Sequence, residues 1–112
     1  MQALVKVAKG DGFLELREVP EPVLDQDDWV IIEVKAAGIC GTDVHIRHDQ
    51  FPYYPPVTLG HEFAGDIVAV GSAVAGWAVG DRIVAEPHSL ACGNCRLCRT
   101  GNIQLCPAKR SP

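Results

Sequence analysis

Short stretches in which apolar and polar residues alternate dominate the first 85 residues of the chain. Alternation places every second side chain on the same face of an extended segment, so it predicts β-strands with one buried face. In the segment 29–36, for example, Ile32, Val34 and Ala36 are expected to share one face. The run 63–70 is rich enough in β-branched residues to favour a buried strand. Segments expected to be strands are 3–7, 14–17, 29–36, 63–70 and 82–85.

Turn-forming residues separate these segments. Glycine, proline and aspartate cluster at 10–12, 20–22, 55–56, 71–72 and 80–81, and their spacing suits a small β-barrel or sandwich. Helix is expected to be scarce. One short helix is predicted at about 42–47, where Thr42 or Asp43 could cap the first turn by accepting a backbone N–H. Cys40 would then lie at the start of this helix.

The composition changes after Pro87, where alternation gives way to cysteine, glycine, asparagine and arginine. We expect a separate lobe at about 88–109, with too few large apolar side chains to fold by hydrophobic burial alone. Tetrahedral zinc with four thiolates would close it, because structural zinc in small peptides binds with about 10–16 kcal/mol. Four thiolates saturate the metal, so this zinc would be structural. The four ligands would be Cys92, Cys95, Cys98 and Cys106.

Two other chemistries fit clustered cysteines. Disulfides are disfavoured if the protein resides in a reducing compartment. An iron–sulfur cluster is the closer rival, since the spacing Cys92–Cys98 (CGNCRLC) followed by Cys106-Pro107 resembles a ferredoxin motif. In that motif, however, the last cysteine follows after three residues, whereas seven residues precede Cys106.

A second group of potential metal ligands lies outside the lobe. Cys40, His61 and Glu62 offer a thiolate, an imidazole and a carboxylate, a combination that zinc accepts. Taken singly, a lone cysteine is usually a small buried residue, and a lone histidine is more often structural than a ligand. Both interpretations stay open on the residues alone.

The motifs around these residues resemble those of the zinc-dependent medium-chain alcohol dehydrogenases. Gly60–Gly65 (GHEFAG) followed by Val70-Gly71 is similar to the family's zinc-site motif, and Cys40–His45 (CGTDVH) and the cysteine lobe occur in the right order around it. The CGTD run looks more like threonine and sorbitol-type polyol dehydrogenases than like liver-type alcohol dehydrogenases. The resemblance covers nearly all of 1–112. It implies a mainly β fold: a GroES-like, partly open barrel with short helices and a four-cysteine zinc lobe.

The resemblance also implies roles for individual residues. Cys40 and His61 would bind a catalytic zinc, with Glu62 either a direct ligand or a carboxylate that exchanges with water. Asp43 would orient His61. Thr42 and His45, three residues apart on one helix face, would form a proton relay, although a helix cap and a solvated surface residue are their plainer interpretations. The cofactors implied are catalytic and structural zinc, and NAD or NADP in the complete enzyme.

Composition limits the possible partners. With 112 residues, 47% of them hydrophobic, and a net charge of -4, the chain offers no basic surface for nucleic acid. It has no signal-like N-terminus and no uncharged stretch long enough to span a bilayer, so we expect no membrane partner and a cytoplasmic location. The resemblance implies a small-molecule alcohol or polyol substrate and a homo-oligomer in the complete enzyme.

The sequence also departs from that of a complete enzyme. No Gly-x-Gly-x-x-Gly motif occurs in these residues, so we expect the NAD(P)-binding Rossmann domain to be absent from this chain and Pro112 to be a point of truncation. The isolated chain would then bind zinc without turnover. Two alternatives are a zinc-stabilised binding or scaffold module with no catalysis and a zinc-free, quinone-reductase-like protein, against which both metal motifs argue.

Other candidate residues have less support. His48 and His88 are interpreted as surface or loop residues, and Glu86 as a solvated strand end that could approach a metal. Aromatic residues in a loop are as often local packing as part of a binding site. With that reservation, Phe51, Tyr53 and Tyr54 are candidates for a pocket wall.

Overall fold

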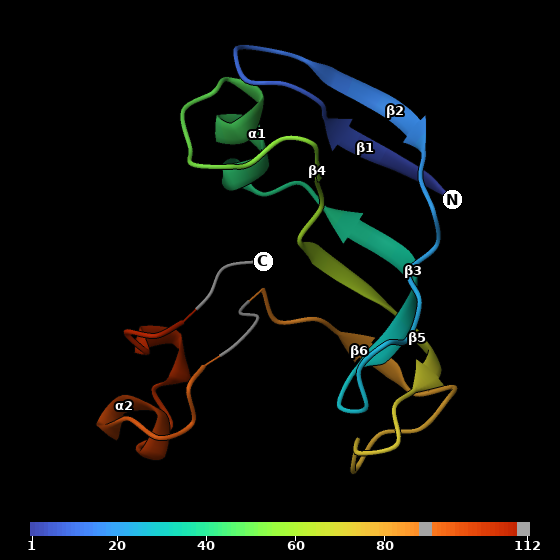
Figure 1. Ribbon diagram of the computed structural model, residues 1–112, viewed down its shortest axis with the longest axis vertical. Helices are drawn as coiled ribbons and strands as arrows, with labels where there is room; N and C mark the ends of the chain where they lie inside the picture. Colours follow the sequence, from blue (N-terminus) through green and yellow to red (C-terminus); the bar gives the residue numbers. More distant parts are fainter. Residues whose placement is uncertain (88–90, 110–112) are drawn as a thin grey trace.

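The computed structural model describes residues 1–87 and 91–109. In these residues the strands form two antiparallel three-stranded sheets, in the orders β2-β1-β4 and β3-β5-β6 (Figure 1). The predicted mainly β fold is confirmed, and each of the five predicted strands is present within two residues at either end. The strands are β1 (Gln2–Lys6), β2 (Leu14–Glu18), β3 (Val30–Gly38), β4 (Val57–Thr58), β5 (Glu62–Val70) and β6 (Arg82–Val84).

Strand β1 is the centre of the first sheet. It pairs with β2 along its whole length, from Gln2 opposite Glu18 to Lys6 opposite Leu14, and its other edge pairs with the short β4. Ala3 and Val5 are buried, as alternation predicts, but Lys6 is also fully buried. Alternation alone would place Lys6 on the opposite face from Ala3 and Val5, and its burial depends on partners that include Arg47, 41 residues away in the sequence.

Strands β3 and β5 form the long pair of the second sheet. The register shifts between Ile31 and Ile32 and again between Val34 and Ala36, which lie opposite Gly65 and Ala64. Neighbouring residues of β5 face opposite sides, so Val34 and Ala36 do not share one face as predicted. The strands approach closely at Gly65, where a Cβ atom would lie 2.2 Å from the Glu33 carbonyl oxygen.

The helices are short. Helix α1 (Gly41–Arg47) begins one residue before the predicted start and follows β3, whereas α2 (Arg96–Arg99) and the 3-10 helix η1 (Ile103–Leu105) belong to the lobe. Of the two cap candidates, Asp43 acts: its Oδ2 accepts the backbone N–H of the N-cap residue Cys40 at 2.9 Å. Across residues 1–87 and 91–109, no helix combines the length and apolar character needed to cross a membrane.

The two sheets are open rather than closed into a complete barrel. Ile67 and Val5 are among the most deeply buried apolar side chains described, while Val84 is 81% exposed, Leu16 68% exposed and Trp77 54% exposed. Figure 1 shows the lobe on one side of the two sheets. The arrangement agrees with the predicted partly open barrel and its cysteine lobe.

Two candidate metal centres

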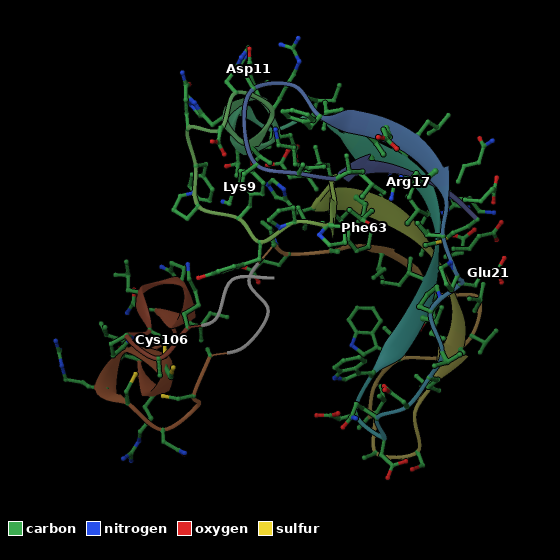
Figure 2. All side chains as sticks on the ribbon, turned by 45° about the horizontal axis from the view of Figure 1, so that its top comes forward. Lys9, Asp11, Arg17, Glu21, Phe63 and Cys106 are labelled. Atoms are coloured by element: carbon green, nitrogen blue, oxygen red, sulfur yellow. The ribbon has the colours of Figure 1, made fainter. Side chains whose placement is uncertain are left out.

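The four lobe cysteines place their sulfur atoms around one point. All four Sγ atoms lie within 4.8 Å of one another. Three of the Sγ–Sγ distances are 3.6 Å for Cys92–Cys106, 3.5 Å for Cys95–Cys98 and 3.9 Å for Cys92–Cys98. A zinc ion bound at about 2.3 Å from each sulfur requires neighbouring sulfurs about 3.8 Å apart. The donor set therefore fits one tetrahedral zinc, and Figure 2 shows the sulfur atoms gathered beside Cys106.

The local backbone explains how so short a segment achieves this. The N–H groups of Cys95 and Cys98 donate to the Sγ atoms of Cys92 and Cys95 at 3.4 Å each, and the N–H of Cys92 donates to Cys106 Sγ at 3.4 Å. Gly93, with φ of 69°, allows the turn between the first two ligands. The lobe is thus shaped by hydrogen bonds to sulfur rather than by a core.

The thiols of the lobe differ in acidity. Backbone hydrogen bonds from Cys95 and Asn94 lower the pKa of Cys92 to about 6. Burial, with added hydrogen bonds from Cys95 and Cys106, raises the pKa of Cys98 to about 12. The protein alone therefore does not favour four thiolates at neutral pH, and a bound cation would supply the compensating charge.

The second group forms where β3 and β5 pair. Cys40, His61 and Glu62 bring one sulfur, one ring nitrogen and one carboxylate oxygen within 4.8 Å of one another. Gly38 lies opposite Glu62 in the pair, and a Cβ atom at Gly38 would lie only 3.3 Å from the Glu62 carboxylate. Cys40 and His61 are half-buried and Glu62 is exposed. Three protein ligands with one open side are typical of a catalytic rather than a structural zinc site.

Asp43 links the two segments that supply these ligands. It is 8% exposed. One carboxylate oxygen, Oδ1, lies 3.4 Å from His61 Nδ1 and accepts the N–H of Gly60 at 3.4 Å, while Oδ2 accepts the N–H of Cys40 at 2.9 Å. With Nδ1 of His61 held by this carboxylate, Nε2 is the ring nitrogen left to bind a metal.

Thr42 and His45 occupy different surroundings on helix α1. Thr42 is half-buried, with Oγ1 3.7 Å from Cys40 Sγ, so the structure brings it to the ligand group. His45 is exposed, and its Nδ1 lies 3.2 Å from Gln50 Oε1. No hydrogen bond joins Thr42 to His45 among the contacts of the described residues.

An apolar hollow of about 590 Å³ lies beside Glu62, between β3, β5 and the segment after β6. Phe63 is part of its wall and is labelled in Figure 2. Glu62 contributes a carboxylate to a lining that is otherwise small or apolar. The remaining lining residues are Ala36, Ala37, Gly38, Ala64, Val84, Ala85 and Pro87.

His48 and Glu86, which the sequence left without a clear role, belong to neither ligand group. His48 Nδ1 is 2.8 Å from Asp11 Oδ1, and Figure 2 shows Asp11 beside helix α1. Glu86 lines a smaller hollow of about 230 Å³ with Trp77. His88 lies outside the described residues.

None of the three loop aromatics lines either hollow described above. Tyr54 is 92% exposed and Phe51 46% exposed, whereas Tyr53 is buried. The hydroxyl of Tyr53 donates to Asp49 Oδ1 at 2.6 Å. Tyr53 is therefore a packing residue rather than part of these pocket walls.

The class of protein with this fold and these two cysteine-containing sites is identified by comparing the chain with known families. Residues 26–111 match the model of the alcohol dehydrogenase GroES-like domain, and the chain belongs to this family. The predicted family resemblance is confirmed.

Named relatives agree with the narrower resemblance. The sorbitol dehydrogenase of Halalkalibacterium halodurans is 43% identical over 110 residues, covering 98% of this chain and 32% of the relative. The L-threonine 3-dehydrogenase of Saccharopolyspora erythraea is 46% identical over 114 residues, with the same coverage of 98% and 32%. The chain thus spans about a third of the length of these relatives.

The fold recurs in a solved structure. A crystal structure named as that of a "putative zinc-binding dehydrogenase" from Sinorhizobium meliloti 1021, bound to NADP, matches with a TM-score of 0.80 and 42% identity. The match covers 99% of this chain and 31% of that chain.

Proposed function

We propose that the chain is the catalytic-domain portion of a zinc-dependent NAD(P) oxidoreductase that oxidises the hydroxyl group of an alcohol, polyol or threonine-like substrate. The observation that carries the proposal is the convergence of Cys40, His61 and Glu62 to within 4.8 Å beside a buried Asp43. The names of the curated relatives support this reaction class. The names of similar solved structures, one zinc-binding and bound to NADP and one NAD-dependent, support the cofactors zinc and NAD or NADP. We assign residues 1–112 to one domain, with the lobe at about 88–109 and the Rossmann domain outside these residues.

The two donor sets would use zinc differently. Cys92, Cys95, Cys98 and Cys106 would hold a structural ion whose coordination is complete. Cys40, His61 and Glu62 would hold the catalytic ion, which when bound supplies Lewis acidity for the substrate oxygen. A nicotinamide cofactor would accept the hydride.

The chain's own residues orient the site and move protons. Asp43 holds Nδ1 of His61 and so fixes the direction of Nε2. The Thr42 hydroxyl, close to Cys40 Sγ, would take the proton of the substrate hydroxyl. His45, exposed on the same helix face, would pass this proton to solvent. The apolar hollow beside Glu62 would offer an apolar surface to the carbon skeleton of a small substrate.

A chimeric enzyme tests the proposal. The matching segment of the Halalkalibacterium halodurans sorbitol dehydrogenase, 43% identical over 110 residues, would be replaced by this chain. We expect the chimera to reduce NAD or NADP with sorbitol, threonine or a simple alcohol. Thr42→Ala should lower kcat by about 10²–10⁴-fold while both zinc ions stay bound. The matched control Thr58→Ala, in the exposed part of β4, should change kcat little.

The isolated chain provides the complementary measurement. Loaded with zinc and mixed with either cofactor and the same substrates, it should bind metal but produce no reduced nicotinamide. Turnover by the isolated chain would contradict the proposed need for a separate cofactor domain. A scaffold module, in contrast, would hold the lobe metal alone and leave a correctly folded, zinc-loaded chimera inactive. The cytoplasmic location, the homo-oligomeric complete enzyme and the lack of nucleic-acid or membrane partners stay predictions.

A further inference from the structure

Lys6 is a charged side chain buried in the first sheet. It is 0% exposed, and the one other buried charged residue in the described part of the chain is Asp43. The Lys6 ammonium group donates to the carbonyl oxygens of Gly10, of Gly12 at 2.5 Å and of Arg47 at 3.1 Å. An ammonium group has three N–H bonds, so these three acceptors satisfy it completely.

Two aromatic rings complete the surroundings of this ammonium group. The centroids of Phe13 and Tyr53 lie 5.8 Å and 5.4 Å from Lys6 Nζ, within the range of a cation–π contact. Burying an ammonium group is unfavourable unless it is fully bonded, and an apolar side chain would fill the position without that desolvation. What the lysine contributes is the geometry that its three hydrogen bonds impose.

Those bonds reach the helix that begins at the candidate metal site. Arg47 is the last residue of α1, whose N-cap is Cys40. The Arg47 carbonyl also accepts the N–H of Gly12 at 2.8 Å. The β1–β2 turn and Lys6 therefore hold the C-terminal end of α1, where the carbonyl groups have no partner inside the helix.

The backbone of the same strand reaches the other ligand segment. Lys6 lies opposite Val57 in β4, and Leu59 donates its N–H to the Leu4 carbonyl at 2.9 Å. The chain then reaches His61 two residues after Leu59. Strand β1 thus contacts both segments that carry the ligands: the C-terminal end of α1 through the Lys6 side chain, and residues 57–59 before His61 through backbone pairing.

We propose that Lys6 is a positioning residue that fixes helix α1 against the β4–β5 segment and so sets the separation of Cys40 Sγ from the ligand atoms of His61 and Glu62. The inference rests on the proposed function, because it takes these three residues to be metal ligands. The lobe shares none of the Lys6 contacts, so the zinc affinity of the lobe should not change with the residue at position 6.

The test compares the variants Lys6→Met and Lys9→Met in the zinc-loaded chain. Lys9 is a suitable control because it also contacts the Tyr53 ring, at 3.7 Å, but donates to the Tyr53 carbonyl rather than to α1. Zinc affinity at each site would be measured by chelator competition, with Co²⁺ absorption to tell the four-thiolate site from the mixed-ligand site. We expect Lys6→Met to weaken the Cys40 site by about 10–100-fold, as loss of a residue that orients ligands does, and Lys9→Met to leave both sites unchanged.

Amide hydrogen exchange separates positioning from general stability. Lys6→Met should reduce the protection of residues 46–48 at the end of α1, with the protection of β5 unchanged. If Lys6→Met does not fold, Lys6→Gln, which keeps two N–H donors, should give a smaller loss of affinity at the same site. A purely structural role would lower the stability of the metal-free chain without changing the affinity of the folded chain.

The outcomes separate the two proposals. A wild-type chain that binds two metal ions, with a folded position-6 variant that binds both equally well, overturns the role of Lys6 and leaves the proposed function standing. A wild-type chain that holds the lobe metal alone contradicts the proposed function and, with it, the role of Lys6. Selective weakening of the Cys40 site in Lys6→Met supports both.

Discussion

The lobe and the partly open barrel formed by the two sheets (residues 1–87) bring their candidate ligands together in opposite ways. In the lobe, four thiols lie within Cys92–Cys106, the backbone bonds directly to their sulfur atoms, and Cys106 is the one buried residue among 91–109. In the barrel, Cys40 and His61 are far apart in the sequence, and the pairing of β3 with β5, together with Asp43, brings them together.

Because of this difference, we expect the order of the lobe to depend on bound metal and that of the Cys40 site to depend on the fold. The lobe has little apolar surface to bury, so we expect its order to depend on a metal bound by its thiols. The Cys40 site takes its geometry from strand pairing and buried polar contacts, so we expect a metal bound there to leave without loss of the fold. We therefore expect the closed donor set to maintain structure and the open one to be available for chemistry.

Removing a lobe ligand should have the largest effect. Cys106→Ser takes away the buried thiol and leaves three donors without a core to support them. We expect loss of the lobe zinc and of amide protection across 92–106, since about 10–16 kcal/mol of binding free energy orders such a segment. Metal analysis and hydrogen exchange measure both. Retained protection in the zinc-free lobe would show that it folds without metal.

Cysteine-to-serine substitution at Cys40 should leave the two sheets folded. Cys40→Ser should abolish tight metal binding at the open site while the lobe zinc stays bound. Because strand pairing maintains the barrel, the free energy of unfolding of the metal-free chain should change by about 1 kcal/mol or less. Urea unfolding and zinc titration test this. A loss of stability as large as that of Cys106→Ser would remove the distinction between the two regions.

Neutralising the carboxylate that orients His61 should have an intermediate effect. Asp43→Asn keeps the size of the side chain but removes the charge that holds His61 Nδ1. Affinity at the open site should fall by about 10–100-fold, with the lobe unaffected. The control is Asp66→Asn, which removes an exposed ion pair with Arg82. Equal effects of the two substitutions would show that charge alone, rather than contact with His61, matters.

The smallest expected effect is on pH dependence, at the Tyr53–Asp49 pair just after the C-terminal end of α1. Burial and the Asp49 carboxylate raise the pKa of Tyr53 from 10.0 to about 12. The stability that this contributes is present below the unfolded pKa of 10.0 and is lost as pH rises to about 12. Tyr53→Phe cannot ionise, so its stability should fall less between pH 10.0 and about 12 than that of the wild-type chain.

In acid, the contribution of the same pair to stability has the opposite pH dependence. The hydrogen bond from Tyr53 lowers the pKa of Asp49, so this contribution is present above the unfolded pKa and is lost as pH falls through the folded pKa. Tyr53→Phe should show a weaker loss in acid too. Urea unfolding at a series of pH values measures both limbs, and curves parallel to wild type at both ends would contradict the assignment.

The sequence predicts features that depend on local pattern or on motifs. Alternation of apolar and polar residues identified where the strands lie because it is a local property of the sequence, although burial does not alternate along β2 and β3. The two groups of potential ligands were also recognisable from residue type and spacing, and the structure brings the members of each group together. The roles of Thr42, His45 and Asp43 in catalysis stay predictions.

Features that depend on distant partners could not be predicted. The bulge between Val34 and Ala36 is a property of the pair of strands, not of either strand alone. Lys6 looks like a polar surface residue because its three acceptors lie in a loop and at the end of a helix 41 residues away. Strand β4, with two residues, is too short to carry a periodic signal.

Counting metal ions before and after mild chelation tests the central contrast most directly. The purified chain would be analysed for zinc and iron, dialysed against a weak chelator and analysed again. The account predicts two zinc ions per chain, of which the one at Cys40, His61 and Glu62 is removed and the one at the four lobe cysteines is retained. A single zinc before chelation, release of both ions together, or iron in the lobe would contradict it.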